Sequence, residues 1–372
     1  METNKRNLGI DFLRIISMFM VVILHVLGNG GVLWSTVPYT MNYNLVWLLE
    51  ILAYCSVNCY ALITGYVSTD TKFKYSRIIS LWLQVAFYTV TITLLFGIFV
   101  PSSVGKSEVI SAVLPMMTEQ YWYFTAYFGL FFFIPFLNEL MNKLSKEQLK
   151  KLIITIIIVL SLIPTFSIGN LFNTPIDLFN TGEGYSMLWL MALYIVGGYF
   201  KKHGFPQLKK HNPFGLYYLL CVIVAWVGKL VSERFAVKYL GQAYFANAFI
   251  GYTSPFIFFS ALFLFLYFAQ CKIKGGVIKK AILLLGPASF GVYLIHVQPL
   301  VWDHIISNRF APYSNFPGAK LVIYVLITAA LIYISCSMID LLRIQLFKLL
   351  RINKFSTSME NQISKVFKKI FK

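Results

Sequence analysis

Apolar stretches long enough to cross a bilayer recur along the whole chain. A membrane-spanning helix needs about 20 mostly apolar residues. Ten stretches satisfy this requirement, at residues 8–27, 45–67, 78–100, 124–140, 152–168, 185–200, 214–231, 246–268, 281–305 and 320–341. Charged residues make up only 12% of the chain, about half of what a soluble domain carries. The sequence therefore predicts an all-α, polytopic integral membrane protein with about ten transmembrane helices.

Lysine and arginine gather in alternate loops between these stretches. One set of loops, together with the C-terminal segment, holds 25 of the 32 Lys and Arg residues, the other set holds 6, and Arg14 lies within the first stretch. Cytoplasmic loops carry the excess of positive residues in membrane proteins, so both termini are predicted to be cytoplasmic. The formal net charge of +18 then reflects topology, and no nucleic-acid partner is predicted.

The chain is predicted to divide into a transmembrane part, residues 1–342, and a basic cytoplasmic tail, residues 343–372. In the tail, apolar residues recur at helical spacing among lysines, at Met359, Ile363, Val366 and Ile370. One interpretation is an amphipathic helix that lies on anionic lipid. The other is a frayed basic tail.

The first stretch carries three ionisable residues, Asp11, Arg14 and His25. Ionisable groups within a span cost several kcal/mol unless they are paired or face a wet cavity, so each marks a candidate site. Arg14 and His25 are 11 residues apart, which places them on one helix face about 16 Å apart along the axis, with Asp11 on the same side. This polar stripe is predicted to face the bundle interior. The alternatives are that Arg14 snorkels to the headgroups while paired with Asp11, and that His25 simply bonds a neighbouring helix.

Polar residues at or within other stretches form further candidate groups. They are Lys72, Lys74 and Arg77 before the third stretch; Glu119, Trp122 and Tyr123 before the fourth; Tyr293, His296 and Asp303 in the ninth; and Glu50 in the second. Positive-inside topology alone also produces the first group, and an interfacial aromatic belt produces the second. Gly286 and Pro287 precede the third group and predict a local break in the helix. The five cysteines predict neither a disulfide nor a zinc site.

Five short motifs follow one another along the chain. They are Asp11-Phe-Leu-Arg14 with His25 after ten residues; Thr64-Gly65-Tyr66; Lys74-x-x-Arg77; Gln120-Tyr-Trp122-Tyr123; and Ser289-x-x-x-Tyr293-Leu-Ile-His296. Their order resembles that of the acyltransferase-3 family of membrane acyltransferases, whose motifs read basic residue–ten residues–His, S-G-[FY], R-x-x-R, [HQ]-x-W-[YF] and S-x-x-x-Y-L-x-H. Thr64 here replaces Ser, and Lys74 replaces an Arg, which weakens any bidentate role at that position. The resemblance covers residues 8–342.

The resemblance is best to stand-alone members from bacterial surface-polysaccharide loci. It implies transfer of an acyl group, most often acetyl, with succinyl as an alternative, from cytoplasmic acyl-CoA to a hydroxyl of a cell-surface polysaccharide or its lipid-linked precursor. It implies acetyl-CoA as a donor substrate, no bound cofactor, and a location in the bacterial plasma membrane. The runner-up is a transporter or flippase for a glycan intermediate, and a scaffold or sensor is the third alternative. The oligomeric state is left open.

The resemblance and the chemistry of the residues together suggest a role for each candidate. His25 is expected to act as general base or as acyl carrier, with Glu50 or Asp303 fixing its tautomer. Donor binding is expected at Arg14, Lys74 and Arg77, acceptor binding at Trp122, Tyr123 and Glu119, and a supporting role at Asp11, Tyr293 and His296. No metal is expected.

Overall fold

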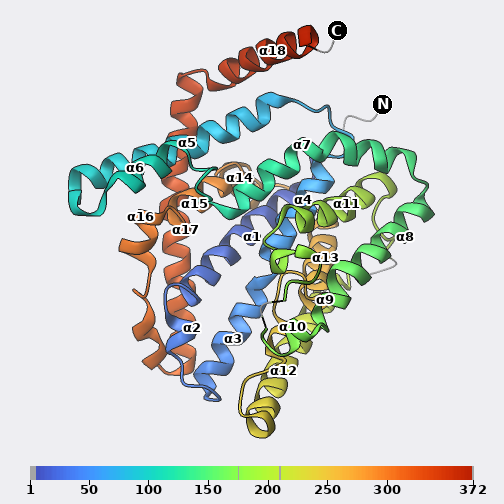
Figure 1. Ribbon diagram of the computed structural model, residues 1–372, viewed down its shortest axis with the longest axis vertical. Helices are drawn as coiled ribbons and strands as arrows, with labels where there is room; N and C mark the ends of the chain where they lie inside the picture. The colour runs from blue at the N-terminus through green and yellow to red at the C-terminus, as the bar shows by residue number, and fades with distance from the viewer. Residues whose placement is uncertain (1–5, 175, 209–210, 371–372) are drawn as a thin grey trace.

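The computed structural model describes residues 6–174, 176–208 and 211–370, with side chains up to residue 365. These residues form helices joined by turns and loops, and no strand is found among them (Figure 1). Within the same residues, seven helical segments are long and apolar enough to cross a membrane. They are α1–α2 (Leu8–Leu27, Val32–Ser35), α3–α4 (Met41–Tyr54, Ser56–Ser68), α5 (Tyr75–Phe99), α7 (Trp122–Lys143), α8 to α9 (Lys146–Thr165), α12 (Phe214–Leu240) and α17 (Gly318–Leu349). The predicted all-α polytopic fold is confirmed.

An eighth span is broken, as the sequence predicts. Helices α14 (Gly276–Leu285) and α15 (Ser289–His296) pass the same test together but meet at an angle of 50°. The break falls at Gly286 and Pro287, because proline cannot donate the backbone hydrogen bond that would continue the first helix. After α15 the chain turns through α16 (Pro299–Val301) and a π-helical turn, Trp302–Ile306. This break sets the direction in which α15 approaches the rest of the bundle.

The two remaining predicted spans form short helices. α11 (Met187–His203) has 17 residues and α13 (Pro255–Ala269) has 15, so they extend about 25 and 22 Å, less than the hydrocarbon thickness of about 30 Å. The eighth predicted stretch was expected to begin at residue 246, and this start is wrong for α13, since residues 246–249 form a 3-10 turn and the helix begins at Pro255. Apolar composition marks burial against protein as well as against lipid, so it does not separate short internal helices from full spans.

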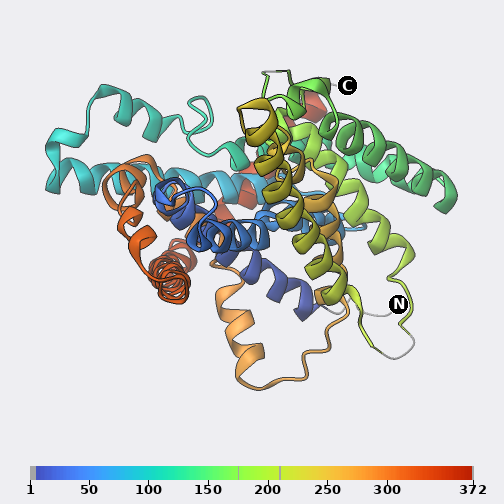
Figure 2. The same cartoon turned by 90° about the horizontal axis from the view of Figure 1, so that it is seen from below.

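Helix α1 lies at the centre of the bundle. It contacts α3, α4, α13, α14, α15 and α17, and Figure 2 shows it between α17, seen nearly end-on, and the α12–α13 pair. The Asn7 side chain accepts from the amides of Gly9 and Ile10 and so caps the helix. The same side chain donates to the Ala269 carbonyl at the end of α13 (2.8 Å). The polar stripe on α1 therefore faces protein, as predicted.

Contacts between helix ends define two sides of the bundle. Asn138, near the end of α7, donates to the Ser68 carbonyl at the end of α4 (3.4 Å), and Lys202, near the end of α11, donates to the Asn142 side chain of α7 (3.0 Å). We call the side formed by the starts of α1 and α5 and the ends of α4, α7, α11 and α13 the basic face, and the other side the opposite face. The loops rich in lysine and arginine lie at the basic face, in agreement with their alternation along the sequence. The orientation of the termini in a membrane stays a prediction.

The C-terminal segment is helical. The predicted boundary at residue 342 falls inside α17, and α18 spans Ile352–Ile370. Helix α18 lies beside the start of α5 (Figure 1), where Ser80 donates to Ser356 (2.9 Å) and the Tyr75 amide donates to Glu360 (2.8 Å). The side chains of Val366 and Ile370 lie outside the described part of the chain. Contact of α18 with anionic lipid stays a prediction.

Helices α4 and α11 cross at two glycines. A Cβ atom on Gly65 would lie 2.1 Å from the carbonyl oxygen of Tyr194, and one on Gly197 would lie 2.1 Å from that of Leu62. Real Cβ atoms do not approach backbone oxygen so closely, so the two helices pack at this distance because neither residue has a side chain. Gly65 belongs to the Thr64-Gly65-Tyr66 motif. The close packing of α4 against α11 explains why this position of the motif is a glycine.

We expect Gly65→Ala to destabilise the protein. The added methyl group must push α4 away from α11, and overpacking of this kind costs about 1–3 kcal/mol. The midpoint of thermal unfolding of the detergent-purified protein should fall by several degrees. Gly97→Ala is the matched control, because no atom lies within 4 Å of a Cβ placed at this lipid-facing position of α5. Equal midpoints for the two variants would show that the crossing tolerates a side chain.

Candidate active site

Two histidines from helices far apart in the sequence meet inside the bundle. Nδ1 of His25 on α1 lies 2.8 Å from Nε2 of His296 on α15, and Nδ1 of His296 lies 2.6 Å from the Val292 carbonyl oxygen. A carbonyl only accepts, so in the neutral ring His296 carries its proton on Nδ1 and accepts at Nε2. His25 then donates from Nδ1. Its Nε2 is left with a free lone pair, which is the form required of a general base.

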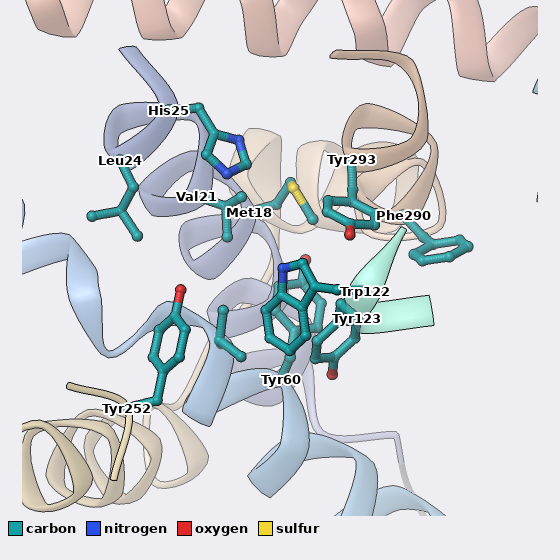
Figure 3. A pocket seen from close by; sticks show the side chains of 11 residues that line it. Met18, Val21, Leu24, His25, Tyr60, Trp122, Tyr123, Tyr252, Phe290 and Tyr293 are labelled. Carbon is teal, nitrogen blue, oxygen red and sulfur yellow. The ribbon is translucent and has the colours of Figure 1, made fainter. Parts of the chain in front are cut away.

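His25 lines a small aromatic cavity of about 50 Å³. The other lining residues are Met18, Val21, Leu24, Val57, Tyr60, Trp122, Tyr123, Tyr252, Phe290 and Tyr293. Figure 3 shows the side chains of His25, Trp122 and Tyr293 pointing toward one another from three different helices. A cavity of this size holds a group of a few atoms, so a whole sugar ring cannot enter it.

His296, Trp122, Tyr123 and Tyr293 are the predicted residues that the fold brings to His25. Glu119 is exposed in a turn and is absent from the described lining of the cavity. Among the described residues, no cluster of three or more His, Cys, Asp or Glu side chains is arranged to hold a metal ion.

The expectation that Glu50 or Asp303 fixes the tautomer of His25 is wrong. The hydrogen bond from His25 Nδ1 goes to His296 instead. Asp303 lies in the π-helical turn after α15 and is exposed, because the break before α15 and the turn after it direct the two parts of this segment to different sides. Glu50 is buried on α3, where it lines a separate cavity on the opposite face.

The expected donor residues lie between this cavity and the basic face. Arg14 forms an ion pair with Asp11 (3.4 Å), which also binds Arg6. Lys74 and Arg77 are exposed before and at the start of α5. Arg14 lies in the second turn of α1 and Arg77 in the first turn of α5, and the starts of both helices belong to the basic face.

Tyrosines continue from this region to the histidine pair. Tyr60 donates to the carbonyl oxygen of Arg14 (2.8 Å), and its ring lies 6.2 Å from that of Tyr123. The Tyr123 ring lies 6.4 Å from that of Tyr293, which packs on His296. Polar and aromatic side chains thus connect the cations near the basic face with His25.

A buried lysine was missed because it was counted with the loop cations, although it lies within the predicted seventh stretch, residues 214–231. Helix α12 continues to Leu240, and Lys229 is only 2% exposed. Its Nζ lies 2.7 Å from the Glu233 carboxylate, and Tyr43 on α3 donates to the same carboxylate (2.7 Å). The i, i+4 spacing of Lys229 and Glu233 is the sequence signal for this pair.

A second missed cluster joins α5 to α17. Asp340 is fully buried and accepts two hydrogen bonds from Arg343 (3.0 and 2.7 Å) and one from the Tyr88 hydroxyl (2.7 Å). Gln84 is a fourth donor (3.3 Å). The i, i+3 spacing of Asp340 and Arg343 in an apolar helix is the available signal. Because the carboxylate is satisfied within the protein, we interpret this cluster as structural.

We expect Asp340→Ala to lower the free energy of unfolding by about 3–5 kcal/mol, because it leaves the Arg343 guanidinium without its anion in a poorly hydrated place. Thermal unfolding in detergent measures the effect. Asp303→Ala is the matched control, since that carboxylate is exposed. An unfolding midpoint equal to that of the wild type would show that the cluster does not hold α5 and α17 together.

Comparison with curated proteins found no match, and comparison with solved structures found none either. The acyltransferase domain that defines the acyltransferase-3 family matches residues 7–339, nearly the whole chain, including both histidines of the pair and the helices that carry them. The chain therefore belongs to the acyltransferase-3 family, and it is a membrane acyltransferase.

Proposed function

We propose that the protein transfers an acyl group, with acetyl favoured, from cytoplasmic acyl-CoA to a hydroxyl of a cell-surface polysaccharide or its lipid-linked precursor in the bacterial plasma membrane. The observation that carries the proposal is the hydrogen-bonded series from Val292 through His296 to His25 at the wall of a small cavity. A base oriented by a second group is the arrangement that activates a hydroxyl for acyl transfer.

In the proposed reaction, His25 Nε2 removes the proton from the acceptor hydroxyl. The hydroxyl oxygen attacks the thioester carbonyl, a C–O bond forms, the C–S bond breaks, and the CoA sulfur leaves and receives the proton from His25. His296 accepts from Nδ1 of His25 throughout and stabilises the imidazolium. In the alternative, His25 Nε2 attacks the thioester first and carries the acyl group as an acyl-imidazole.

The distribution of charge supports a donor that enters from the basic face. Coenzyme A is a polyanion, and a basic surface raises its local concentration. Lys74 and Arg77 would bind its phosphates at the surface, and Arg14 would bind deeper polar groups. The thin pantetheine arm would then pass the tyrosines that lead to His25, over the distance of about 16 Å that separates Arg14 from His25 on one helix face.

We expect His25→Ala and His296→Ala each to reduce acyl transfer by about 10²–10⁴-fold, the contribution typical of a general base. The measurement is transfer of label from acetyl-CoA to glycan by the purified protein in proteoliposomes. His304→Ala is the matched control, because His304 is exposed and packs on Phe96. A near wild-type rate for His25→Ala would remove the proposed role of this residue.

Arg14→Ala and Arg77→Ala should each weaken binding of acetyl-CoA about tenfold or more, since a hydrogen bond to a charged group contributes about 1.5–3 kcal/mol. Titration calorimetry with coenzyme A measures the affinity without turnover. Lys106→Ala is the control, because Lys106 is an exposed cation beyond the far end of α5, away from the basic face. Unchanged affinity in both arginine variants would exclude them from the donor site.

A transporter or flippase for a glycan intermediate is the second candidate. The bend of 50° between α14 and α15 favours it, because discontinuous helices often line transport sites. One experiment separates the two functions: proteoliposomes receive labelled acetyl-CoA and a candidate glycan. Label on the glycan supports the enzyme, whereas movement of unlabelled glycan across the bilayer supports the carrier.

A further inference from the structure

A second, larger cavity opens on the opposite face. It has a volume of about 470 Å³, within the range of small-molecule sites. Its walls come from three parts of the chain: residues 33–54 with α3, the loops of residues 164–183, and the turns of residues 247–254. Unlike the cavity at His25, it has many polar groups in its lining, including the amides of Asn170, Asn173 and Asn247.

A buried polar group on α3 lines this cavity without a partner. Glu50 is 7% exposed, and among the described residues its Oε2 has no hydrogen-bond partner. Trp47, one turn earlier on the same helix, also lines the cavity. A buried polar atom without a partner is costly in free energy, so a ligand that donates to Glu50 would gain affinity there. A sugar hydroxyl is such a donor.

Aromatic rings complete the cavity. Trp34 is 74% exposed and lies edge-on to Trp47, with ring centroids 6.4 Å apart. An exposed indole face offers an apolar, polarisable surface to the C–H face of a sugar ring, while the amides around it suit the hydroxyl groups. Trp47 is held in place by the buried Lys229, whose Nζ lies 3.8 Å from the centroid of its ring.

The charge of the lining distinguishes between classes of sugar. The described lining includes three carboxylates, Glu50, Asp177 and Glu183, and no Lys or Arg. Asp177 is already bound by Thr181 and Gly182, and the charge of the nearby Lys229 is paired with Glu233. An acidic sugar would therefore meet the exposed carboxylates of Asp177 and Glu183 and the buried carboxyl group of Glu50 without a cation to pair with it, which disfavours binding.

The two cavities adjoin. Tyr54 lines the polar cavity, and its ring centroid lies 5.0 Å from that of Tyr252, which lines the cavity at His25. Tyr252 also stacks on Trp122, at 6.1 Å. Because the cavity at His25 is too small for a sugar ring, the ring of an acceptor would stay in the polar cavity, and the side chains of Tyr54 and Tyr252 would have to move aside for its hydroxyl to reach His25.

We infer that the polar cavity on the opposite face is the acceptor-binding site and that it selects neutral or amino sugars over acidic ones. This inference rests on the proposed acyl transfer for the identity of its ligand. It assigns Glu50 to acceptor binding, with Trp34 and Trp47 as stacking partners, in place of the role in orienting His25 that the sequence suggested.

Binding without a donor tests the inference directly. Fluorescently labelled, detergent-purified protein is applied to an array of neutral, amino and uronic-acid oligosaccharides of matched length. Retention is expected on neutral or amino sugars, with affinity at least tenfold higher than for any acidic oligosaccharide. Preferred retention on acidic sugars, or retention on none, would overturn the inference.

Variants then locate the site with the oligosaccharide that binds best. Trp34→Ala and Glu50→Gln should each weaken binding at least tenfold, whereas Trp82→Ala, at an exposed position of α5 outside the described lining of the cavity, should leave it unchanged. Wild-type affinity in both cavity variants would overturn the assignment. If label transfer from acetyl-CoA persists but the sugar preference and the loss of binding in the cavity variants are not observed, the acceptor site lies elsewhere and the proposed function stands. If binding follows this pattern but no label is transferred, the acyl transfer is what fails.

Discussion

Hydrocarbon offers no hydrogen-bond partner, so the ionisable side chains on the central helix α1 have to be satisfied by the protein itself. Asp11 is bound by Arg6 and Arg14, and His25 is bound by His296. These contacts fix the rotation of α1 and hold α15 against it. The cavity at His25 lies between the same two helices and the start of α7, so its position follows from the way in which the polar stripe is satisfied.

The break between α14 and α15 makes the pairing of His25 with His296 possible. The bend at Gly286 and Pro287 separates α15 from α14, which lets α15 approach α1 with its own direction. His296 bonds the Val292 carbonyl one turn earlier in its own helix, so a local interaction sets its tautomer. The hydrogen bond between His296 and Val292 within α15, together with the contact between His296 and His25, therefore leaves the lone pair of His25 on Nε2.

Local features of the site could be predicted from the sequence, and long-range ones could not. Helical periodicity placed Arg14 and His25 on one face of α1, and Gly286-Pro287 marked the break. The partner of His25 lies 271 residues away. Glu50 or Asp303 was expected in that position and His296 only in a supporting role, because the packing of the helices cannot be read from the sequence. Lys229 was counted with the loop cations for a related reason: its ion pair with Glu233, and the Tyr43 hydroxyl of α3 that bonds the same carboxylate, become apparent only from the packing of the helices.

The basic face and the polar cavity on the opposite face differ in charge, and this difference suits the two proposed substrates, an anionic acyl donor and a sugar acceptor. Exposed cations at the basic face attract a polyanion, while the polar cavity on the opposite face contains carboxylates and, among its described lining residues, no cation. A donor that entered from the opposite face would meet like charge, and an acidic acceptor would be drawn to the basic face. His25 lies between these regions at a cavity of about 50 Å³, so neither substrate needs to cross: only an acyl group and a hydroxyl have to meet there.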